Sequence, residues 1–66
     1  MIVLVNGERV DYGDACTVAE VIRRHQLQPE TTLVEHNGTA LRRDEWPDKL
    51  LRENDRLEIL RVAAGG

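Results

Sequence analysis

The sequence predicts an α+β domain in which one main helix packs on one face of a mixed sheet of four to five strands. Two Asn-Gly dipeptides, Asn6-Gly7 and Asn37-Gly38, each follow a run of β-forming residues, and Asn-Gly is the strongest short-range hairpin signal. One helical stripe lies between them, and a last strand is predicted from Arg56 to Val62. The predicted order is therefore strand, strand, helix, strand, short strand, strand.

Length and composition limit what the chain can do. Its 66 residues suffice for one domain, and a domain of this size buries only about 60% of its unfolded surface. The formal net charge of −3 argues against a nucleic-acid partner, because binding to the phosphate backbone depends on clustered Lys and Arg. We expect a single domain over residues 1–66, with 63–66 as a flexible C-terminal tail.

Cysteine usage and hydropathy bear on where the protein acts. Cys16 is the only cysteine, so no internal disulfide is possible. No apolar run approaches the ~20 residues that cross a membrane, and the N-terminus lacks a charged segment followed by a long apolar one. We expect a cytoplasmic protein with no membrane partner.

The first hairpin and the helix have clear local signals. The opening run is rich in β-branched residues, and the return run, Glu8 to Tyr12, alternates polar and apolar residues. Thr17 and Glu20 form a capping box, in which the Thr hydroxyl accepts a backbone N–H and the Glu side chain reaches back. With Pro29 as a terminator, these signals predict a helix from Val18 to about Gln26.

The second half of the chain alternates strands with an irregular segment. Leu33 to Asn37 and Thr39 to Leu41 are predicted to be strands joined by the second Asn-Gly turn. The stretch from Arg42 to Arg52 is charged and has no clear hydrophobic period. We therefore expect a short irregular or 3₁₀ segment there, with Trp46 and Leu50 turned inward.

The first and last strands carry apolar side chains on both faces. Leu4 lies on the face opposite Val3, and Leu60 and Val62 lie on the face opposite Leu57. One helix covers only one face, so the polar-apolar alternation of a half-solvated sheet is broken. Either the irregular segment partly covers the second face, or Leu4, Leu60 and Val62 form an exposed apolar patch that marks a partner site.

The Gly-Gly end of the chain can be interpreted either as a frayed terminus or as a reactive group. Small terminal residues are often merely frayed. An enzyme that activates a carboxyl terminus, however, must thread it through a channel to the α-phosphate of ATP, and glycine passes because it has no Cβ. The Gly66 carboxylate is ionised at neutral pH and can attack that phosphate. Gly66 is thus a candidate modified residue and Gly65 a candidate threading residue.

No other residues predict catalysis or metal binding. Cys16, His25 and His36 lie apart in the sequence, without the spacing of metal ligands. Cys16 has no base beside it and is expected to be a small, partly buried side chain. We expect His25 at a helix C-terminus, His36 on a strand surface, and Trp46 over a core edge with its N–H on a carbonyl or solvent. The chain is not predicted to be an enzyme or to hold a cofactor or metal.

The whole chain resembles the ThiS family, the sulfur carrier proteins of thiamin biosynthesis. The segments that carry the resemblance are the first hairpin, MIVLVNGE, the helix start, TVAEVI, the middle segment, VEHNGTALRRDEW, and the last strand with its tail, NDRLEILRVAAGG. Asn37, Arg43 and Trp46 stand at matching positions of the middle segment. The resemblance implies the ubiquitin-like β-grasp fold, with the first and last strands as parallel neighbours. That arrangement would place Leu4 beside Leu60.

The resemblance also implies a function and a set of partners. An E1-like adenylyltransferase of the ThiF type would adenylate Gly66 with Mg-ATP, and a cysteine desulfurase or rhodanese-type protein would supply sulfur for a thiocarboxylate. A thiazole synthase of the ThiG type would then take that sulfur into the thiazole ring. Three alternatives stay open: a carrier for molybdopterin or another sulfur product, a ubiquitin-like modifier of lysines, and an interaction module with an inert tail. A transiently docking monomer is the expected oligomeric state.

Overall fold

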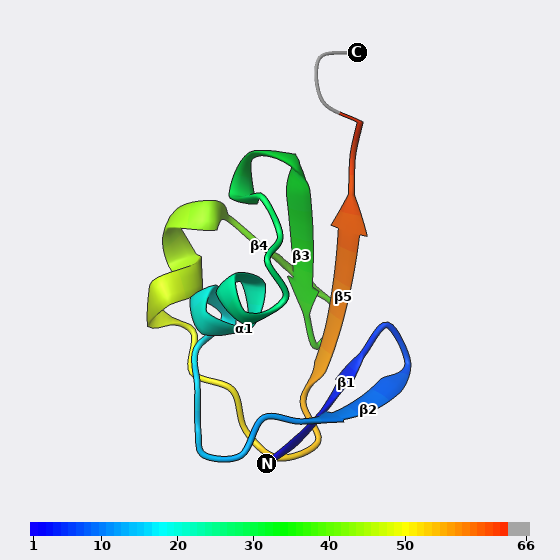
Figure 1. Ribbon diagram of the computed structural model, residues 1–66, viewed down its shortest axis with the longest axis vertical. Coiled ribbons are helices and arrows are strands. Elements are labelled where there is room, and N and C mark those ends of the chain that lie inside the picture. Colours follow the sequence, from blue (N-terminus) through cyan, green and yellow to red (C-terminus); the bar gives the residue numbers. More distant parts are fainter. Residues whose placement is uncertain (64–66) are drawn as a thin grey trace.

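The computed structural model describes residues 1–63, in which five strands form one mixed sheet (Figure 1). The strands are β1 (Ile2–Val5), β2 (Glu8–Asp11), β3 (Thr32–His36), β4 (Thr39–Leu41) and β5 (Arg56–Arg61). Their order across the sheet is β2-β1-β5-β3-β4. β1 and β5 run parallel, and the other neighbouring pairs are antiparallel. The predicted α+β class and β-grasp arrangement are confirmed, with β5 at the centre.

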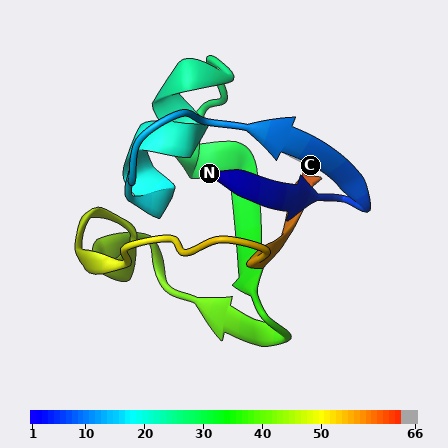
Figure 2. The same cartoon turned by 90° about the horizontal axis from the view of Figure 1, so that it is seen from below.

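Three helices connect the strands and lie to one side of the sheet. They are α1 (Val18–Arg24) and the 3₁₀ helices η1 (Pro29–Thr31) and η2 (Arg43–Asp48). Seen from below, α1 and η2 lie on the same side of the strands (Figure 2). Within residues 1–63, the opposite face of the sheet therefore has no helix over it. None of the helices described in this part of the chain is long and apolar enough to cross a bilayer.

Both ends of α1 follow from local backbone chemistry. The Glu20 N–H donates to Thr17 Oγ1 at 3.2 Å and the Thr17 N–H donates to Glu20 Oε1 at 3.4 Å, which forms the predicted capping box. The helix ends at Arg24, slightly before the predicted Gln26. Gln26 takes a φ of 57°, and a left-handed residue of this kind ends a helix.

The core lies between the sheet, α1 and η2. Its buried members are mostly aliphatic: Val3, Tyr12, Cys16, Val18, Val21, Ile22, Val34, Trp46, Leu51, Leu57 and Ile59. Val3 and Leu57, from the parallel central strands, are both fully buried. The core therefore depends on the pairing of β1 with β5, two segments from opposite ends of the chain.

The segment after η2 buries a different leucine from the one predicted. Leu51 is 1% exposed, whereas Leu50 is 57% exposed, so the prediction that Leu50 turns inward is wrong. Leu50 forms an isolated bridge with Thr17, and the Leu51 N–H donates to the Cys16 carbonyl at 2.9 Å. Successive side chains of such an extended stretch point to opposite sides. The pairing with residues 16 and 17 thus turns Leu51 toward the core.

Trp46 is buried as predicted, but its N–H is not satisfied as expected. The side chain is 4% exposed and belongs to the core cluster. Its Nε1 is buried, and among residues 1–63 it has no hydrogen-bond partner. Within this part of the chain, the expected contact with a carbonyl or solvent is therefore not formed.

Each Asn-Gly turn has the left-handed backbone that its residues permit. The φ values are 50° and 83° at Asn6 and Gly7, and 50° and 85° at Asn37 and Gly38, as a type I′ turn requires. The first turn also attaches its hairpin to β5. The Ile59 N–H donates to Asn6 Oδ1 at 2.7 Å, and Asn6 Nδ2 donates to the Ile59 carbonyl at 3.1 Å. The Asn6 amide thus extends the pairing of β1 with β5.

We expect Asn6→Gly to lower the free energy of unfolding by about 1–2 kcal/mol more than Asn54→Gly. Glycine keeps the positive φ, but the two hydrogen bonds to Ile59 are lost, each worth about 1 kcal/mol net. Asn54 is the matched control, because it also has a positive φ, 69°, while its side chain makes no hydrogen bond within residues 1–63. Urea unfolding measures both variants, and equal losses would contradict the role of the Asn6 amide.

His36 attaches the second hairpin to the loop before β5. Its Nε2 lies 2.8 Å from Asp55 Oδ2, and only 15% of its side chain is exposed. The expectation that His36 is a strand surface residue is therefore wrong. His36 pairs with Leu57 across the β3-β5 ladder, and cross-strand partners share one face of the sheet. The side chain consequently points to the same face as a core residue.

The carboxylate of Asp55 is stabilised in its charged form. Burial raises its pKa, but hydrogen bonds from His36, the Arg52 N–H and Asn37 outweigh burial, so its pKa lies below the usual value. A depressed pKa in the folded state adds stability that is present above the unfolded-state pKa of about 3.9. That stability is lost as the pH falls through the lower folded-state pKa.

We expect Asp55→Asn to flatten the fall in unfolding free energy between about pH 5 and pH 2. The variant lacks the charge whose protonation destabilises the native protein, so it also starts from a lower unfolding free energy at pH 7. Asp14→Asn is the control, because Asp14 is exposed and makes no hydrogen bond within residues 1–63. Urea unfolding across this pH range checks the prediction. An acid profile of Asp55→Asn as steep as that of the unaltered chain would contradict it.

Candidate functional site

Strand β5 leads to the C-terminal residues on which the predicted chemistry depends. The Val62 N–H donates to the carbonyl of Thr31, the last residue of η1, at 2.8 Å, so the hydrogen bonding continues one residue beyond the ends of β3 and β5. The C-terminal end of β5 lies at the opposite end of the molecule from the N-terminus (Figure 1). Gly65 and Gly66 lie outside the described residues 1–63.

Exposed apolar side chains gather where β5 ends. Leu33 and Leu60 stand opposite each other in the β3-β5 register, and each is 56% exposed. Val62, on the same face as Leu60, is 45% exposed. We call Leu33, Leu60 and Val62 the apolar patch. The irregular segment does not cover these residues, because its helix η2 packs against α1 on the other side of the sheet.

Leu4 is not beside Leu60, contrary to the expectation. In the parallel ladder Leu4 pairs with Arg56, near the start of β5, and Leu4 is only half-exposed. β1 has 4 residues and reaches only the first part of β5. The sequence reasoning also missed Leu33, although its position between the buried Thr32 and Val34 follows strand alternation.

An acidic pair borders the apolar patch along the sheet. Glu35 and Glu58 stand directly opposite each other in the β3-β5 register, and both are exposed. Like charges placed in this way on neighbouring strands are destabilising. The apolar patch is therefore bordered along the sheet by two exposed carboxylates.

Comparison with known proteins identifies the family to which this architecture belongs. A model of the ThiS family matches residues 3–66. The chain belongs to the ThiS family. The matched residues include four of the strands in full, β1 except for Ile2, and the segment that follows β5.

Two solved structures are similar to this ThiS-family chain. The crystal structure of the thiamine biosynthesis protein ThiS from Geobacter metallireducens has a TM-score of 0.82 and 30% identity, and the match covers 100% of both chains. The NMR solution structure of a thiamine biosynthesis protein from the same organism also has a TM-score of 0.82 and 30% identity, covering 100% of this chain and 88% of that one. No curated protein of similar sequence was found.

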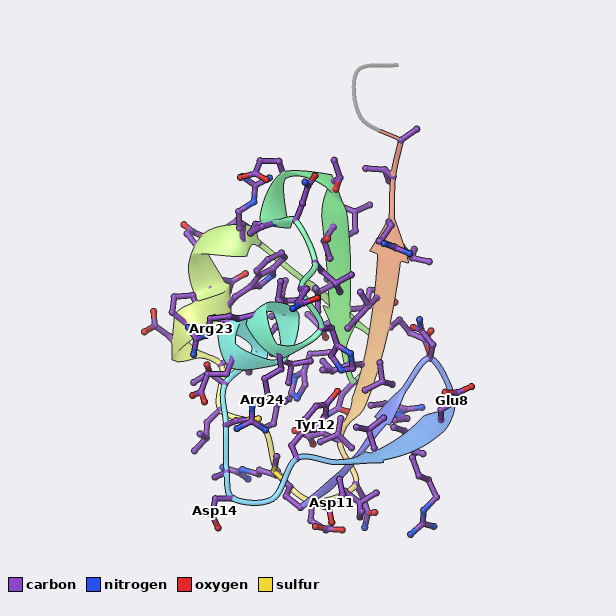
Figure 3. All side chains as sticks on the ribbon, in the orientation of Figure 1. Glu8, Asp11, Tyr12, Asp14, Arg23 and Arg24 are labelled. Atoms are coloured by element: carbon purple, nitrogen blue, oxygen red, sulfur yellow. The ribbon has the colours of Figure 1, made fainter. Side chains whose placement is uncertain are left out.

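Cys16 and His25, two side chains of this ThiS-family member that could act as a nucleophile or a base, have structural roles. Cys16 is 1% exposed, and burial raises the pKa of its thiol, which disfavours the nucleophilic thiolate. His25 caps the C-terminal end of α1 as expected, and its Nε2 lies 2.7 Å from the Tyr12 hydroxyl. Tyr12 in turn lies beside Arg24 (Figure 3), whose guanidinium is 5.9 Å from the ring centre. These contacts tie α1 to the end of the first hairpin.

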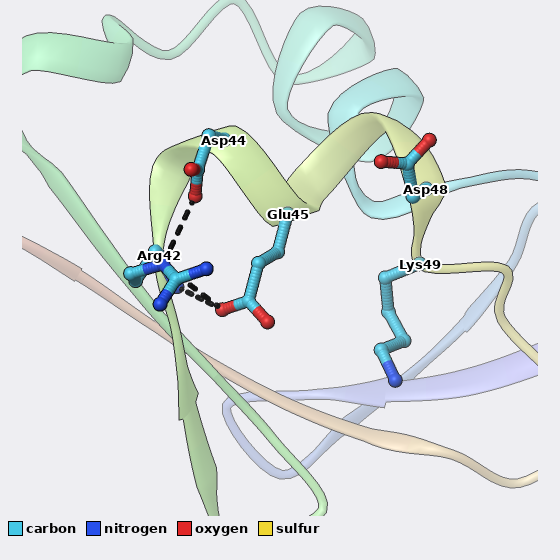
Figure 4. Close-up of a pocket in the computed structure, with 5 residues that line it drawn as sticks. All are labelled: Arg42, Asp44, Glu45, Asp48 and Lys49. Atoms are coloured by element: carbon cyan, nitrogen blue, oxygen red, sulfur yellow. Dashed lines mark hydrogen bonds and ion pairs between the residues drawn. The ribbon is translucent and has the colours of Figure 1, made fainter.

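A shallow charged hollow of about 380 Å³ lies along η2 (Figure 4). It is lined by Arg42, Asp44, Glu45, Asp48 and Lys49. Arg42 Nε lies 3.2 Å from Asp44 Oδ1 and 3.9 Å from Glu45 Oε1, and exposed pairs of this kind contribute little energy. Within the described part of the chain, no group of three or more His, Cys, Asp or Glu side chains could hold a metal ion.

Proposed function

We propose that this chain is a sulfur carrier of thiamin biosynthesis and that the carboxylate of Gly66 is its reactive group. The family match supports the proposal most directly, because it extends through residue 66. The thiamine biosynthesis protein ThiS matches the chain over 100% of both lengths. The domain would serve as a co-substrate of its partner enzymes, with no catalytic residue of its own.

Activation of the carboxylate would use ATP held by a partner. A Gly66 carboxylate oxygen attacks the α-phosphorus of Mg-ATP in an E1-like enzyme of the ThiF type, pyrophosphate leaves, and an acyl-adenylate forms. Gly65 suits the approach to that site, because a residue without Cβ passes a narrow channel. The dependence on ATP fits a cytoplasmic location.

Sulfur would then replace the adenylate. A sulfur nucleophile from a cysteine desulfurase or a rhodanese-type protein attacks the carbonyl carbon of Gly66, and AMP leaves. Where the nucleophile is a persulfide, a second thiol must open the resulting acyl disulfide to release the thiocarboxylate. A thiazole synthase of the ThiG type would take the sulfur from this group.

The folded domain would contribute recognition. The apolar patch lies at the end of β5 that leads toward Gly66, so a partner that covers Leu60 and Val62 also reaches the C-terminal residues. Burial of apolar area is favourable by about 25 cal/mol per Å². A patch of three exposed side chains suits partners that bind one after another and release the carrier, in keeping with a monomer that docks transiently.

Intact-protein mass spectrometry tests the proposed chemistry. After incubation with a ThiF-type enzyme, Mg-ATP, cysteine and a cysteine desulfurase, the chain should gain the mass difference between sulfur and oxygen. Tandem fragmentation should assign the gain to Gly66, and a reaction without ATP is the control. An unchanged mass, under conditions in which the same enzyme converts its own carrier, would refute the proposal. A chain joined to lysine side chains would indicate a protein modifier.

The sulfur acceptor requires a separate experiment. The thiocarboxylate form should bind a ThiG-type thiazole synthase and support thiazole formation there. The large subunit of molybdopterin synthase is the comparison partner, since a molybdopterin carrier would deliver the same group to it. Sulfur transfer to that subunit alone would assign the chain to the second pathway.

A further inference from the structure

Strand β5 has one backbone edge that β1 covers only in part. The Val62 N–H donates to the Thr31 carbonyl, and the Asn37 N–H donates to the Arg56 carbonyl. Hydrogen-bonded residues of an antiparallel pair alternate along the strand, so the even-numbered residues of β5 pair with β3. The odd-numbered residues turn their N–H and C=O groups to the other edge, toward β1.

Asn6 is the last residue to occupy that edge. Its N–H donates to the Leu57 carbonyl at 2.8 Å, and its side chain pairs with both backbone groups of Ile59. The chain then turns away into the hairpin. The next odd-numbered residue, Arg61, has no partner for its N–H or C=O among residues 1–63. The edge of β5 beyond the β1-β2 hairpin lies open in Figure 1.

A hollow of about 290 Å³ adjoins this open edge. It is lined by Val5, Asn6, His25, Leu27, Ile59 and Arg61. Three of these side chains are aliphatic, so an apolar side chain fits among them. Arg61 supplies a positive charge, and within the described residues it takes part in no ion pair. On a chain with a net charge of −3, this places an isolated cation at an apolar hollow beside free backbone groups.

We propose that Arg61 and the adjoining hollow bind an extended acidic segment of a partner protein as an added strand. The segment would continue the line of β1 beside β5 and pair with the N–H and C=O of Arg61. Strand addition takes its affinity from such main-chain hydrogen bonds and its specificity from alternate side chains. One apolar side chain enters the hollow, and a neighbouring carboxylate pairs with the Arg61 guanidinium. A guanidinium can donate two parallel N–H bonds to the two oxygens of a carboxylate.

This site is distinct from the apolar patch and from the chemistry of Gly66. Leu60 and Val62 present their side chains on the open face of the sheet, whereas Arg61 and Ile59 point to the face of the hollow. The free backbone groups of Arg61 lie in the plane of the sheet between the two. A single partner could cover both surfaces, but strand addition requires neither the patch nor an activated carboxylate.

Selection from a phage-displayed library of short random peptides on the full chain tests this inference. Recovered peptides should alternate acidic and apolar residues. On titration with a recovered synthetic peptide, the largest amide chemical-shift changes should fall on Asn6, Leu27, Ile59 and Arg61, and exchange of the Arg61 amide hydrogen should slow. A copy of the peptide with N-methylated backbone should not bind.

Variants of β5 separate the backbone contribution from the charge. Arg61→Pro removes both the free N–H and the guanidinium but no hydrogen bond to β3, and proline is tolerated at such an edge, so it should weaken peptide binding by more than about tenfold. Arg61→Gln keeps the N–H and should weaken binding less, with a reduced salt dependence. Arg56→Gln is the matched control, since Arg56 is exposed on the same strand while its backbone pairs with Asn37, and its affinity should not change.

Several outcomes would overturn the inference. Peptides whose shifts map to Leu33 and Leu60, or to the outer strands β2 and β4, would place the binding surface elsewhere. Unchanged affinity in Arg61→Pro, with its fold verified by urea unfolding, would exclude strand addition at this edge. Shifts at Arg61 that grow with protein concentration in the absence of peptide would identify a second copy of the chain as the occupant.

Discussion

Deletion of Gly66 is expected to abolish sulfur transfer while the domain stays folded. The reactive carboxylate of the proposed mechanism belongs to this residue, so its removal shortens the chain that must reach the α-phosphate of ATP. The buried residues of the described chain, by contrast, lie between Val3 and Ile59. The midpoint of urea unfolding should therefore stay within experimental error, while mass spectrometry after the activation reaction shows no gain of sulfur.

Gly66→Ala tests whether the small size of the terminal residue matters in addition to its carboxylate. The variant keeps a terminal carboxylate but adds a Cβ. The Cβ restricts the accessible φ and ψ values and hinders passage through a narrow channel. We expect the rate of adenylation, measured by ATP-pyrophosphate exchange, to fall by about tenfold or more without complete loss. Sulfur transfer that survives deletion of Gly66, or a large loss of stability on deletion, would contradict the proposed role of this residue.

The elements that the sequence predicts well are those whose cause is local. Thr17 and Glu20 cap α1 because their spacing allows two reciprocal hydrogen bonds within one turn. The two Asn-Gly turns form because Asn and Gly tolerate positive φ, whatever the rest of the chain does. Such signals require no knowledge of distant neighbours, so they can be read from a few consecutive residues.

Three of the failed predictions, those on Leu4, Leu50 and His36, concern contacts between distant segments. The position of Leu4 relative to Leu60 depends on the parallel register of β1 and β5, which no turn connects. The choice of Leu51 over Leu50 depends on contacts with Cys16 and Thr17. The half-buried position of His36 depends on its contact with Asp55. Sequence alternation fixes which residues share a face but leaves open how far one strand is shifted along another.

These long-range contacts decide the composition of the candidate site. Leu33 joins the apolar patch through its register with Leu60. Among residues 1–63 the backbone of Arg61 has no partner on the β1 side, because Asn6 ends the coverage of β5 by the first hairpin. Sequence alone predicted two members of the patch, Leu60 and Val62, from their alternation with the core residue Leu57. The open edge beside Arg61 could be found only once the strand order and the register were known.

Leu60→Glu is expected to weaken binding to the ThiF-type activating enzyme by about tenfold or more. The substitution places a charge at the centre of the apolar patch, where a bound partner would exclude water and leave that charge unpaired. Because Leu60 is 56% exposed in the free domain, the unfolding free energy should change by less than about 1 kcal/mol. Titration calorimetry and the KM of the carrier in adenylation measure the effect on recognition.

Leu50→Glu is the matched control for this prediction. Leu50 has nearly the same exposure, 57%, but it lies outside the patch, beside Thr17 at the start of α1. A general effect of replacing a surface leucine by a charge would weaken both variants alike, whereas recognition through the patch weakens only Leu60→Glu. At saturating carrier Leu60→Glu should still be adenylated, unlike the Gly66 deletion. Equal affinities of the two leucine variants for the enzyme would remove the patch from the binding surface and leave the C-terminal residues as the sole determinant.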